Sequence, residues 1–246
     1  MTLREAFKLS IMNRNGNMRG SMAVMRRLAA AAFALLVGGC TLQQQLLFAL
    51  IPDGTIPMML GNFESVDETN RRRIVEFEKG RDWDGLAKFA EGNINKEKSN
   101  HEWWIIAGYA YSQGGQRKRA IECYAEAVRL SPDDILGWNL LAQSYRTAGQ
   151  SDRALQVATR ALNVRSDSAD TWFLVGETNS DLGRLEPATR AYGAAIQLDQ
   201  SHAHAWLGLG KAYARLGRTD ELKKVAETLR QLDPVLAKEL AGFSGK

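Results

Sequence analysis

Histidine and cysteine, the residues that most often bind metals or act as nucleophiles, are scarce: this chain of 246 residues holds three His and two Cys. One residue separates His202 from His204, and closely spaced imidazoles are frequent in zinc sites. A zinc site needs at least a third protein ligand, and none lies near this pair in the sequence. We interpret the pair as a solvated junction between structural units and predict neither a metal site nor a cofactor.

No stretch of the chain has the pattern of a catalytic motif. The run Gly208-Leu209-Gly210-Lys211 is superficially similar to a phosphate-binding loop, but it lacks the Walker spacing and falls inside a predicted helix. Its glycines are therefore interpreted as packing residues. G-x-S-x-G, H-E-x-x-H and a Cys/His pair are all missing from the sequence. Acidic residues are scattered over predicted helix surfaces, so we predict that the protein is not an enzyme.

Cys40 ends a segment with the design of a secretory signal peptide. Residues 25–40 read MRRLAAAAFALLVGGC, with two arginines, a short apolar run and then small residues before the cysteine. The apolar run, residues 28–36, is too short to cross a bilayer and is typical of a signal sequence. The ending resembles the lipobox of bacterial lipoproteins. This resemblance implies that Cys40 becomes the lipid-modified first residue of the mature protein.

Residues 1–39 are thus predicted to be a signal peptide. Within them, residues 1–17 show no clear pattern and stay untranslated if synthesis starts at a later methionine. Three such methionines precede the apolar run: Met18, Met22 and Met25. Thr41 stands where inner-membrane retention would typically require Asp, which favours the outer membrane on its periplasmic side. An ordinary signal peptide with an incidental cysteine and an uncleaved anchor are the alternatives.

The basic character of the chain comes from this leader. The formal net charge is +4 and the pI is near 9.1. Residues 1–39 hold six Lys or Arg and one Glu, a net charge of +5, so the remainder carries −1. Because the mature protein is nearly neutral, overall basicity gives no argument for nucleic acid as a partner.

Cys123 falls in a predicted helix and has no cysteine to pair with if Cys40 is lipid-modified. A redox role would need a second thiol or an activating neighbour, and neither is evident in the sequence. We predict a structural thiol that is buried or half-buried.

The dominant pattern is a repeat of 34 residues that begins at His101. A tryptophan opens each unit: Trp104, Trp138, Trp172 and Trp206. A glycine divides each unit: Gly115, Gly149, Gly183 and Gly217. Small residues recur between them: Gly108, Ala142, Gly176 and Gly210, then Ala120, Ala154 and Ala188. A fixed period of this length is typical of solenoids built from helical hairpins.

This pattern resembles the tetratricopeptide repeat (TPR), whose motif is W-x2-L-G-x2-Y, then A-x3-F, then A and P. The resemblance covers four units: 101–134, 135–168, 169–202 and 203–236. Each unit is expected to form two short helices joined at the glycine, which can take the left-handed backbone that often ends a helix. One pair cannot bury its apolar face alone, so we predict an all-α fold in which the pairs stack into an α-solenoid.

Both ends of the array are expected to be caps. Residues 67–100 contain two helical stretches with poor motif residues, as in a degenerate helix pair that closes a stack. A short closing helix is predicted after Pro234, and residues 237–246 form the C-terminal cap. Six motif positions are unusual: Asn179 and Ala158 replace aromatic residues, Ser166 and Gln200 replace the proline, and Leu222 and Leu229 replace small residues. The last unit is therefore predicted to pack differently, against a cap.

Residues 40–66 are predicted to tether the repeats to the membrane, although they are unusually apolar for a tether. Pro52, Gly54 and Pro57 argue against a long helix in this segment. The alternatives are that it folds back onto the solenoid, lies at the membrane surface, or forms a docking strip for a partner protein.

The resemblance implies that repeat positions 2, 5, 9, 12 and 13 line a concave groove. It assigns ten residues to partner binding: Ile105, Tyr109, Asn139, Gln143, Arg146, Phe173, Glu177, Leu207, Lys211 and Arg215. This mixed lining suits an extended or helical peptide. The lysine/asparagine clamp with which chaperone-binding members hold a terminal carboxylate is missing, which disfavours that ligand.

Two functions are therefore expected. The first is a lipid-anchored periplasmic scaffold that binds protein or peptide partners of an envelope assembly, such as a pilus secretin, a cell-wall machine or a polysaccharide exporter. The second is an envelope accessory protein that binds a glycan or small ligand and stacks it on Tyr109 and Phe173.

Overall fold

The computed structural model describes residues 60, 61 and 63–244, which form helices and loops without any strand. The helices are α4 (Glu68–Lys79), α5 (Trp83–Lys96), α6 (His101–Gln113), α7 (Arg117–Leu130), α8 (Ile135–Thr147), α9 (Ser151–Val164), α10 (Ala169–Asp181), α11 (Leu185–Leu198), α12 (Ala203–Arg215), α13 (Thr219–Leu232) and α14 (Pro234–Ser244). The chain divides into two compact units, 1–43 and 44–246, and all described residues belong to the second. The predicted signal peptide and Cys40 lie outside the described residues.

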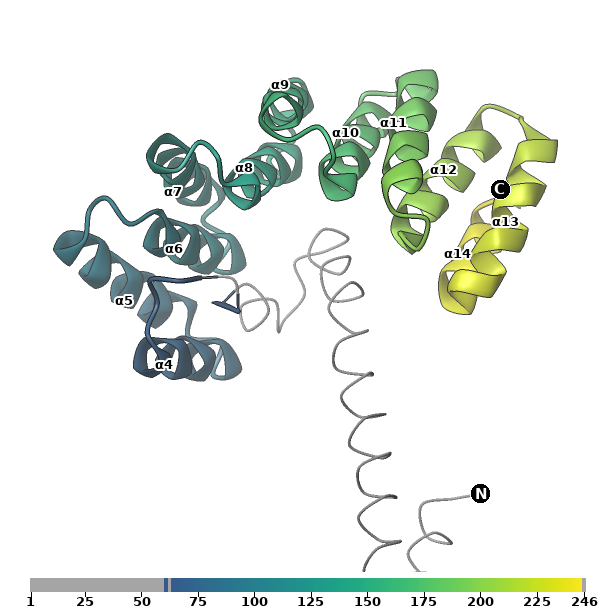
Figure 1. Cartoon of the computed structure of the whole chain (residues 1–246). Coiled ribbons are helices and arrows are strands. Elements are labelled where there is room, and N and C mark those ends of the chain that lie inside the picture. Colours follow the sequence, from purple (N-terminus) through teal and green to yellow (C-terminus); the bar gives the residue numbers. More distant parts are fainter. Residues whose placement is uncertain (1–59, 62, 245–246) are drawn as a thin grey trace, which may run out of the picture. The chain divides into compact units, whose positions relative to one another are not determined.

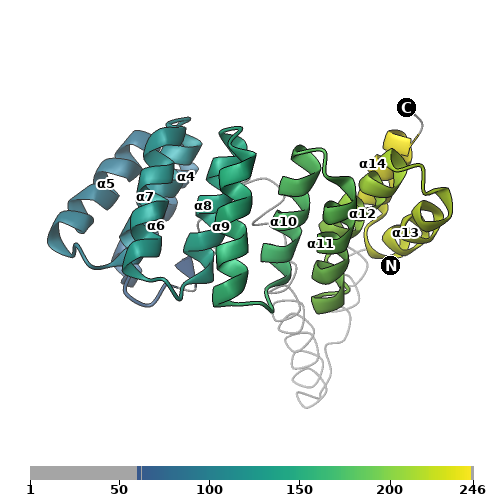
Figure 2. The same ribbon diagram turned by 90° about the horizontal axis from the view of Figure 1, so that it is seen from above.

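Within this second unit, the helices follow one another as pairs that stack side by side (Figure 1). The first helices α6, α8, α10 and α12 form one row, and the second helices α7, α9, α11 and α13 form the row behind it (Figure 2). This arrangement confirms the predicted all-α solenoid. We call the side of the first row that faces away from the second helices the inner face.

Local sequence explains where the first helices begin and end. The residue before each one caps it with a side chain that accepts a hydrogen bond from a first-turn backbone N–H: Asn100, Asp134, Ser168 and His202. Each of the four repeat glycines has a φ of 70–73°, the left-handed region in which glycine meets no steric penalty. In the N-terminal pair Arg81 takes this role instead, with φ of 50°, and Gly80 stays right-handed.

Aromatic rings packed on glycines hold the helices together. The ring of Tyr124 lies over Gly108, and the ring of Tyr192 lies against both Gly176 of α10 and Gly208 of α12. A Cβ atom at any of these three glycines would lie 2.6 Å from a ring carbon. Because Tyr192 touches two successive first helices, it fixes the junction between repeats 3 and 4.

At the unusual motif positions, other side chains fill the space between helices that a ring against a glycine fills elsewhere. Ala142 and Ala158 stand where Gly108 and Tyr124 stand in the first repeat, and both alanines are fully buried. At Gly210 the nearest side chain is Leu240 of α14, whose methyl would lie 2.6 Å from an added Cβ. The cap therefore supplies the apolar group that the last repeat lacks, as predicted for a unit that packs against a cap.

The repeat tryptophans also bind the loops that join the pairs. The indole N–H of each donates to the backbone carbonyl six residues earlier, at 3.4 Å for Trp104, 2.8 Å for Trp138, and 2.9 Å for Trp172 and Trp206. The rings are half-buried. This second role, fixing the loop, is not evident from the spacing alone.

The described end of the predicted tether packs onto the repeats. Three of its apolar side chains belong to the main core: Leu60, Phe63 and Val66. The Glu102 carboxylate accepts backbone N–H groups from Glu64 at 2.8 Å and Ser65 at 3.0 Å. Arg71 donates to three backbone carbonyls of the same stretch. Of the three alternatives predicted for residues 40–66, the described residues of this segment show the first: they fold back onto the solenoid.

Of the two histidines at the junction of repeats 3 and 4, which were expected to be solvated, His202 is buried and His204 is half-buried. His202 is fully buried: its Nδ1 accepts the Ala205 N–H at 3.1 Å, and its Nε2 lies 3.4 Å from an Asp170 carboxylate oxygen. The backbone N–H therefore occupies the Nδ1 lone pair, while Nε2 has no hydrogen-bond partner among the described residues. Burial lowers the pKa of His204 below its ordinary value, and the nearby His202 lowers it further by a smaller amount.

Replacement of Gly208 by alanine should destabilise the protein relative to Gly193→Ala. The new methyl group at Gly208 meets the Tyr192 ring, and overpacking of this kind costs about 1–3 kcal/mol. At Gly193, on α11, an added Cβ meets nothing within 4 Å, so this variant gains only the better helix propensity of alanine, about 1 kcal/mol. Urea unfolding followed by circular dichroism measures both, and equal changes in the two variants would contradict the role of Tyr192.

The free energy of unfolding should fall as the pH drops below about 6.5, the ordinary pKa of His204. Because the folded-state pKa is lowered, the unfolded chain binds the proton more readily and protonation favours unfolding. Urea unfolding between about pH 7.5 and about pH 5 should therefore show a steeper loss of stability for the native protein than for His204→Gln. Parallel pH curves would rule out this contribution.

Candidate partner-binding face

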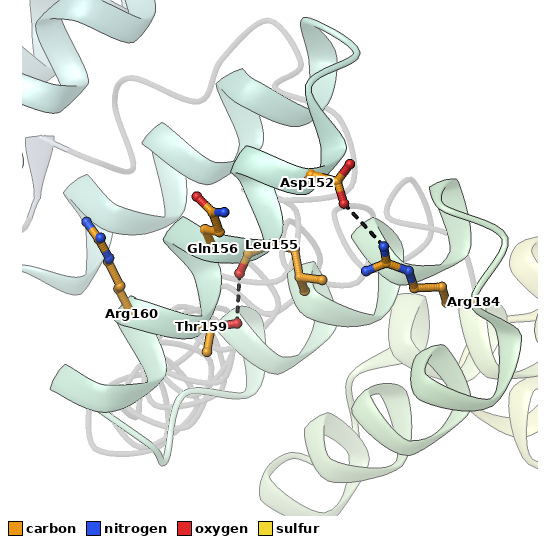
Figure 3. A pocket seen from close by; sticks show the side chains of 6 residues that line it. All are labelled: Asp152, Leu155, Gln156, Thr159, Arg160 and Arg184. Carbon is orange, nitrogen blue, oxygen red and sulfur yellow. Dashed lines mark hydrogen bonds and ion pairs between the residues drawn. The ribbon is translucent and has the colours of Figure 1, made fainter.

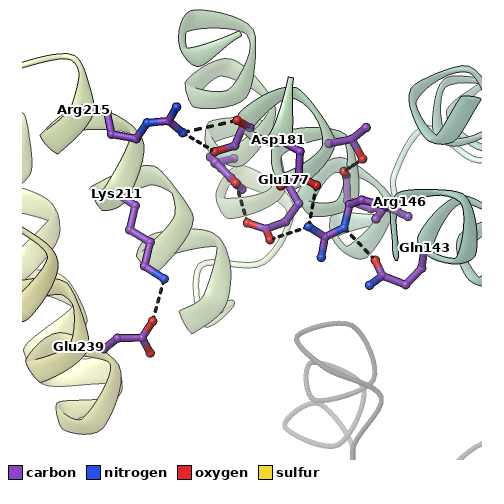
Figure 4. Close-up of polar contacts among 11 residues, drawn as sticks. Gln143, Arg146, Glu177, Asp181, Lys211, Arg215 and Glu239 are labelled. Atoms are coloured by element: carbon purple, nitrogen blue, oxygen red, sulfur yellow. Dashed lines mark hydrogen bonds and ion pairs between the residues drawn. The ribbon is translucent and has the colours of Figure 1, made fainter. Parts of the chain in front are cut away.

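Polar side chains on the inner face connect each first helix from α8 to the cap α14 (Figure 4). We call this set the polar ladder; it consists of Gln143, Arg146, Glu177, Ser180, Asp181, Lys211, Arg215 and Glu239. Each of its contacts between helices crosses one boundary between neighbouring units of the stack. The ladder therefore links neighbouring units along the inner face.

At the boundary between repeats 2 and 3, one cation serves two carboxylates. The guanidinium of Arg146 lies 3.0 Å from Asp181 and 3.4 Å from Glu177, and it also donates to Gln143 at 3.3 Å. The Arg146 side chain is only 17% exposed, so solvent screens this pair of contacts less than a typical surface ion pair.

Tyr192 links the ladder to the core beneath it. Its hydroxyl donates to the Glu177 carboxylate at 2.6 Å. Burial raises the pKa of Tyr192 far above its ordinary value, and the charge of Glu177 raises it further. The phenol therefore remains a proton donor at any physiological pH. The ring that wedges α10 against α12 therefore also orients an acidic side chain on the inner face.

The inner face of repeat 4 carries positive side chains, opposite in sign to the carboxylates of repeat 3. Lys211 pairs with Glu239 of α14 at 2.7 Å. Arg215 donates to the Ser180 hydroxyl at 3.3 Å and to the Ser180 backbone carbonyl at 3.4 Å. Within the described part of the chain, Arg215 has no carboxylate partner, and it is exposed.

Only four of the ten predicted groove residues are accessible: Arg146, Glu177, Lys211 and Arg215. The other six are buried: Ile105, Tyr109, Asn139, Gln143, Phe173 and Leu207. The prediction that these six line an open groove is wrong, because they pack between neighbouring helices. Asn139, for example, accepts the hydroxyl of Thr171 in the next repeat at 2.9 Å, and the Tyr109 hydroxyl donates to Glu78 of α4 at 3.0 Å. Partner binding at the four accessible residues stays a prediction.

The sequence prediction of the site missed Glu239, which belongs to the cap and has no place in the repeat register. Ser180 and Asp181 occupy repeat positions 12 and 13, which the register assigned to the groove lining, although neither was among the ten residues assigned to partner binding. Their importance comes from contacts with Arg146 and Arg215 on neighbouring helices, which one unit considered by itself does not show.

A shallow hollow of about 450 Å³ lies on the second row of helices (Figure 3). It is lined by residues of α9 and by one residue just before α11: Asp152, Leu155, Gln156, Thr159, Arg160 and Arg184. Asp152 and Arg184 form an exposed ion pair of 3.3 Å at one side of it. No side chain that lines it is fully buried, which makes it a weaker candidate site than the polar ladder.

Cys123 is buried, as predicted, and burial raises the pKa of its thiol to about 12. The thiol is therefore protonated and unreactive at neutral pH. The described residues contain no cluster of three or more His, Cys, Asp or Glu side chains that could hold a metal ion. In the same part of the chain, every helix is too short or too polar to span a membrane.

Comparisons with known proteins agree with this architecture. Models of the tetratricopeptide repeat match residues 101–144 and 138–171, and a model of the TPR repeat matches residues 180–217. A comparison with curated protein sequences gives no match.

Solved structures with a similar fold include the following three. MamA is 21% identical, with a TM-score of 0.59, over 67% of this chain and 96% of MamA. TTC0263, a thermophilic TPR protein of Thermus thermophilus, is 19% identical, with a TM-score of 0.57, over 70% of this chain and 95% of its own. YrrB, described as a TPR protein with an unusual peptide-binding site, is 18% identical, with a TM-score of 0.55, over 69% of this chain and 88% of its own.

At these identities the structural likeness establishes the fold and nothing further. The sequence matches cover α6 to α9 and then α11 and α12, the same part in which the glycines and tryptophans recur. The chain thus contains tetratricopeptide repeats, and its described part folds as a TPR α-solenoid.

Proposed function

We propose that this protein is a non-enzymatic scaffold that binds a protein or peptide partner along the inner face of repeats 2 to 4. The observation that carries this proposal is the polar ladder, which presents charged side chains of both signs on one face of a TPR solenoid. The TPR fold is generally suited to binding proteins and peptides, and buried side chains such as Asn139, Phe173 and Leu207 give this face a firm base.

The inner face offers polar contacts more than apolar pockets. Its apolar positions are closed by packing between helices, as Phe173 and Leu207 show. Affinity at such a surface depends on hydrogen bonds and charge complementarity, which favour selectivity and rapid association. A partner held this way is expected to bind reversibly and with clear dependence on ionic strength.

We further propose that the scaffold is a lipoprotein of the bacterial outer membrane that faces the periplasm and serves an envelope assembly. The support is the run from Met25 to Cys40, with its arginines, short apolar stretch and lipobox-like ending. Lipid at Cys40 would hold the repeats near the membrane and limit their partners to envelope proteins. No specific observation favours a glycan ligand, since Tyr109 and Phe173 are both buried and cannot stack on a sugar.

A photo-crosslinking residue at Thr147 should capture defined envelope proteins in cells. Thr147 is exposed at position 13 of repeat 2, next to Arg146 of the ladder. Thr159, equally exposed on α9, is the matched control on the second row of helices. Mass spectrometry should find partners that crosslink at Thr147 and not at Thr159. The same proteins at both positions, or none at Thr147, would move the binding site away from the inner face.

Replacement of Cys40 by serine should release the protein from the membrane fraction, while Cys123→Ser should leave its distribution unchanged. Each buried methylene of an acyl chain contributes about 0.8 kcal/mol, and stable anchoring needs more than one chain. Cell fractionation and mass spectrometry of the N-terminal peptide measure the outcome. An unmodified Cys40 in the native protein, or equal membrane binding of the two variants, would refute the anchor.

A further inference from the structure

We propose that the inner face selects a partner segment that carries an acidic and a basic side chain close together, the acidic one at Arg215 and the basic one at Asp181. This inference rests on the proposed function and names the chemistry of the partner. It follows from how the charges of the polar ladder are paired.

At repeat positions 9 and 13, the charge of the inner face reverses between repeats 3 and 4. Repeat positions 9 and 13 are Glu177 and Asp181 on α10, and they are Lys211 and Arg215 on α12. Helix residues four apart lie on the same face, so each helix presents two like charges in line. The two helices are neighbours in the inner row, joined by the Tyr192 wedge.

Pairing within the protein leaves one charge of each sign incompletely compensated. The two carboxylates of repeat 3 share a single cation, Arg146, and the Asp181 side chain is 41% exposed. On repeat 4, Lys211 has its own carboxylate in Glu239. Arg215 contacts only neutral groups of Ser180 among the described residues.

Arg215 and Asp181 do not neutralise each other although both lie next to Ser180. Arg215 reaches the hydroxyl and carbonyl of Ser180, while the Asp181 carboxylate turns to Arg146 on the other side of α10 (Figure 4). An acidic side chain from a partner would give the Arg215 guanidinium the planar, two-oxygen acceptor that it lacks. A basic side chain would share the excess carboxylate charge of repeat 3.

This arrangement also discriminates against segments of a single charge. A purely acidic segment long enough to cover both repeats would meet the carboxylates of repeat 3, and a purely basic one would meet Lys211 and Arg215. Repulsion by like charges is an effective source of specificity. The complementary partner therefore carries both signs in an order that matches the reversal.

The test uses the purified full chain in detergent micelles and a set of fluorescent peptides on a Gly/Ser backbone. One series carries Glu and Lys at neighbouring or near-neighbouring positions, and matched series carry Glu alone, Lys alone, or Gln at both places. Fluorescence anisotropy should show the tightest binding for a member of the mixed series. Arg215→Gln and Asp181→Asn should each weaken that peptide by about two- to fivefold, the effect of an exposed ion pair.

Arg190→Gln is the control variant, because Arg190 is an exposed arginine on α11 in the second row of helices and does not line the hollow on that row. It should bind the mixed peptide as the native protein does. The inference is overturned if the mixed peptides bind no more tightly than the Gln series, if no peptide binds, or if Arg190→Gln and Arg215→Gln weaken binding equally.

A crosslinker at Thr147 separates this inference from the proposed function. Peptides of every series that crosslink at Thr147 with equal affinity would leave the inner face as a peptide-binding site and remove the charge selectivity. Capture of envelope proteins in cells at Thr159 instead of Thr147 would remove both.

Discussion

The contact on which this architecture depends is the packing of an aromatic ring on a helix that has glycine where other residues carry Cβ. Tyr192 illustrates it fully, because its ring occupies the space that side chains at Gly176 and Gly208 would fill. Protein interiors are packed as densely as organic crystals, so a ring of this size sets the separation of the two helices. That separation in turn decides which side chains on the inner row can reach each other.

Different side chains fill the space between the helices at different points along the stack. Where Ala142 faces Ala158, two small residues replace a glycine and a ring, and the buried cluster around them is separate from the main core. At the end of the stack, Leu240 of the cap takes over the role of the ring against Gly210. At the junction between repeats 3 and 4, a single ring touches both first helices, and the charge of positions 9 and 13 reverses at the same junction.

The sequence predicted the features that repeat and missed those that depend on neighbours. The 34-residue step was sufficient to place the helix pairs and the left-handed glycines, because these depend on local backbone chemistry. The accessibility of Phe173 and Leu207 was predicted wrongly. A register position indicates which way a side chain points, whereas burial also depends on how closely the next repeat packs. Glu239 and the stretch around Ser65 lie outside the register, so no periodic argument could connect them to Lys211 or Glu102.

The buried ring and the exposed charges form one physical system. The Tyr192 hydroxyl donates to Glu177, so the position of this carboxylate is fixed from beneath by the same side chain that fixes the helices. Arg146 approaches Glu177 from the preceding repeat, and Arg215 approaches the adjacent Ser180 from the following one. A partner that changes the pairing of these charges therefore acts on the junction between repeats and not on free surface side chains. For the same reason, the charged side chains are ordered before binding. Less conformational entropy is therefore lost when a partner binds.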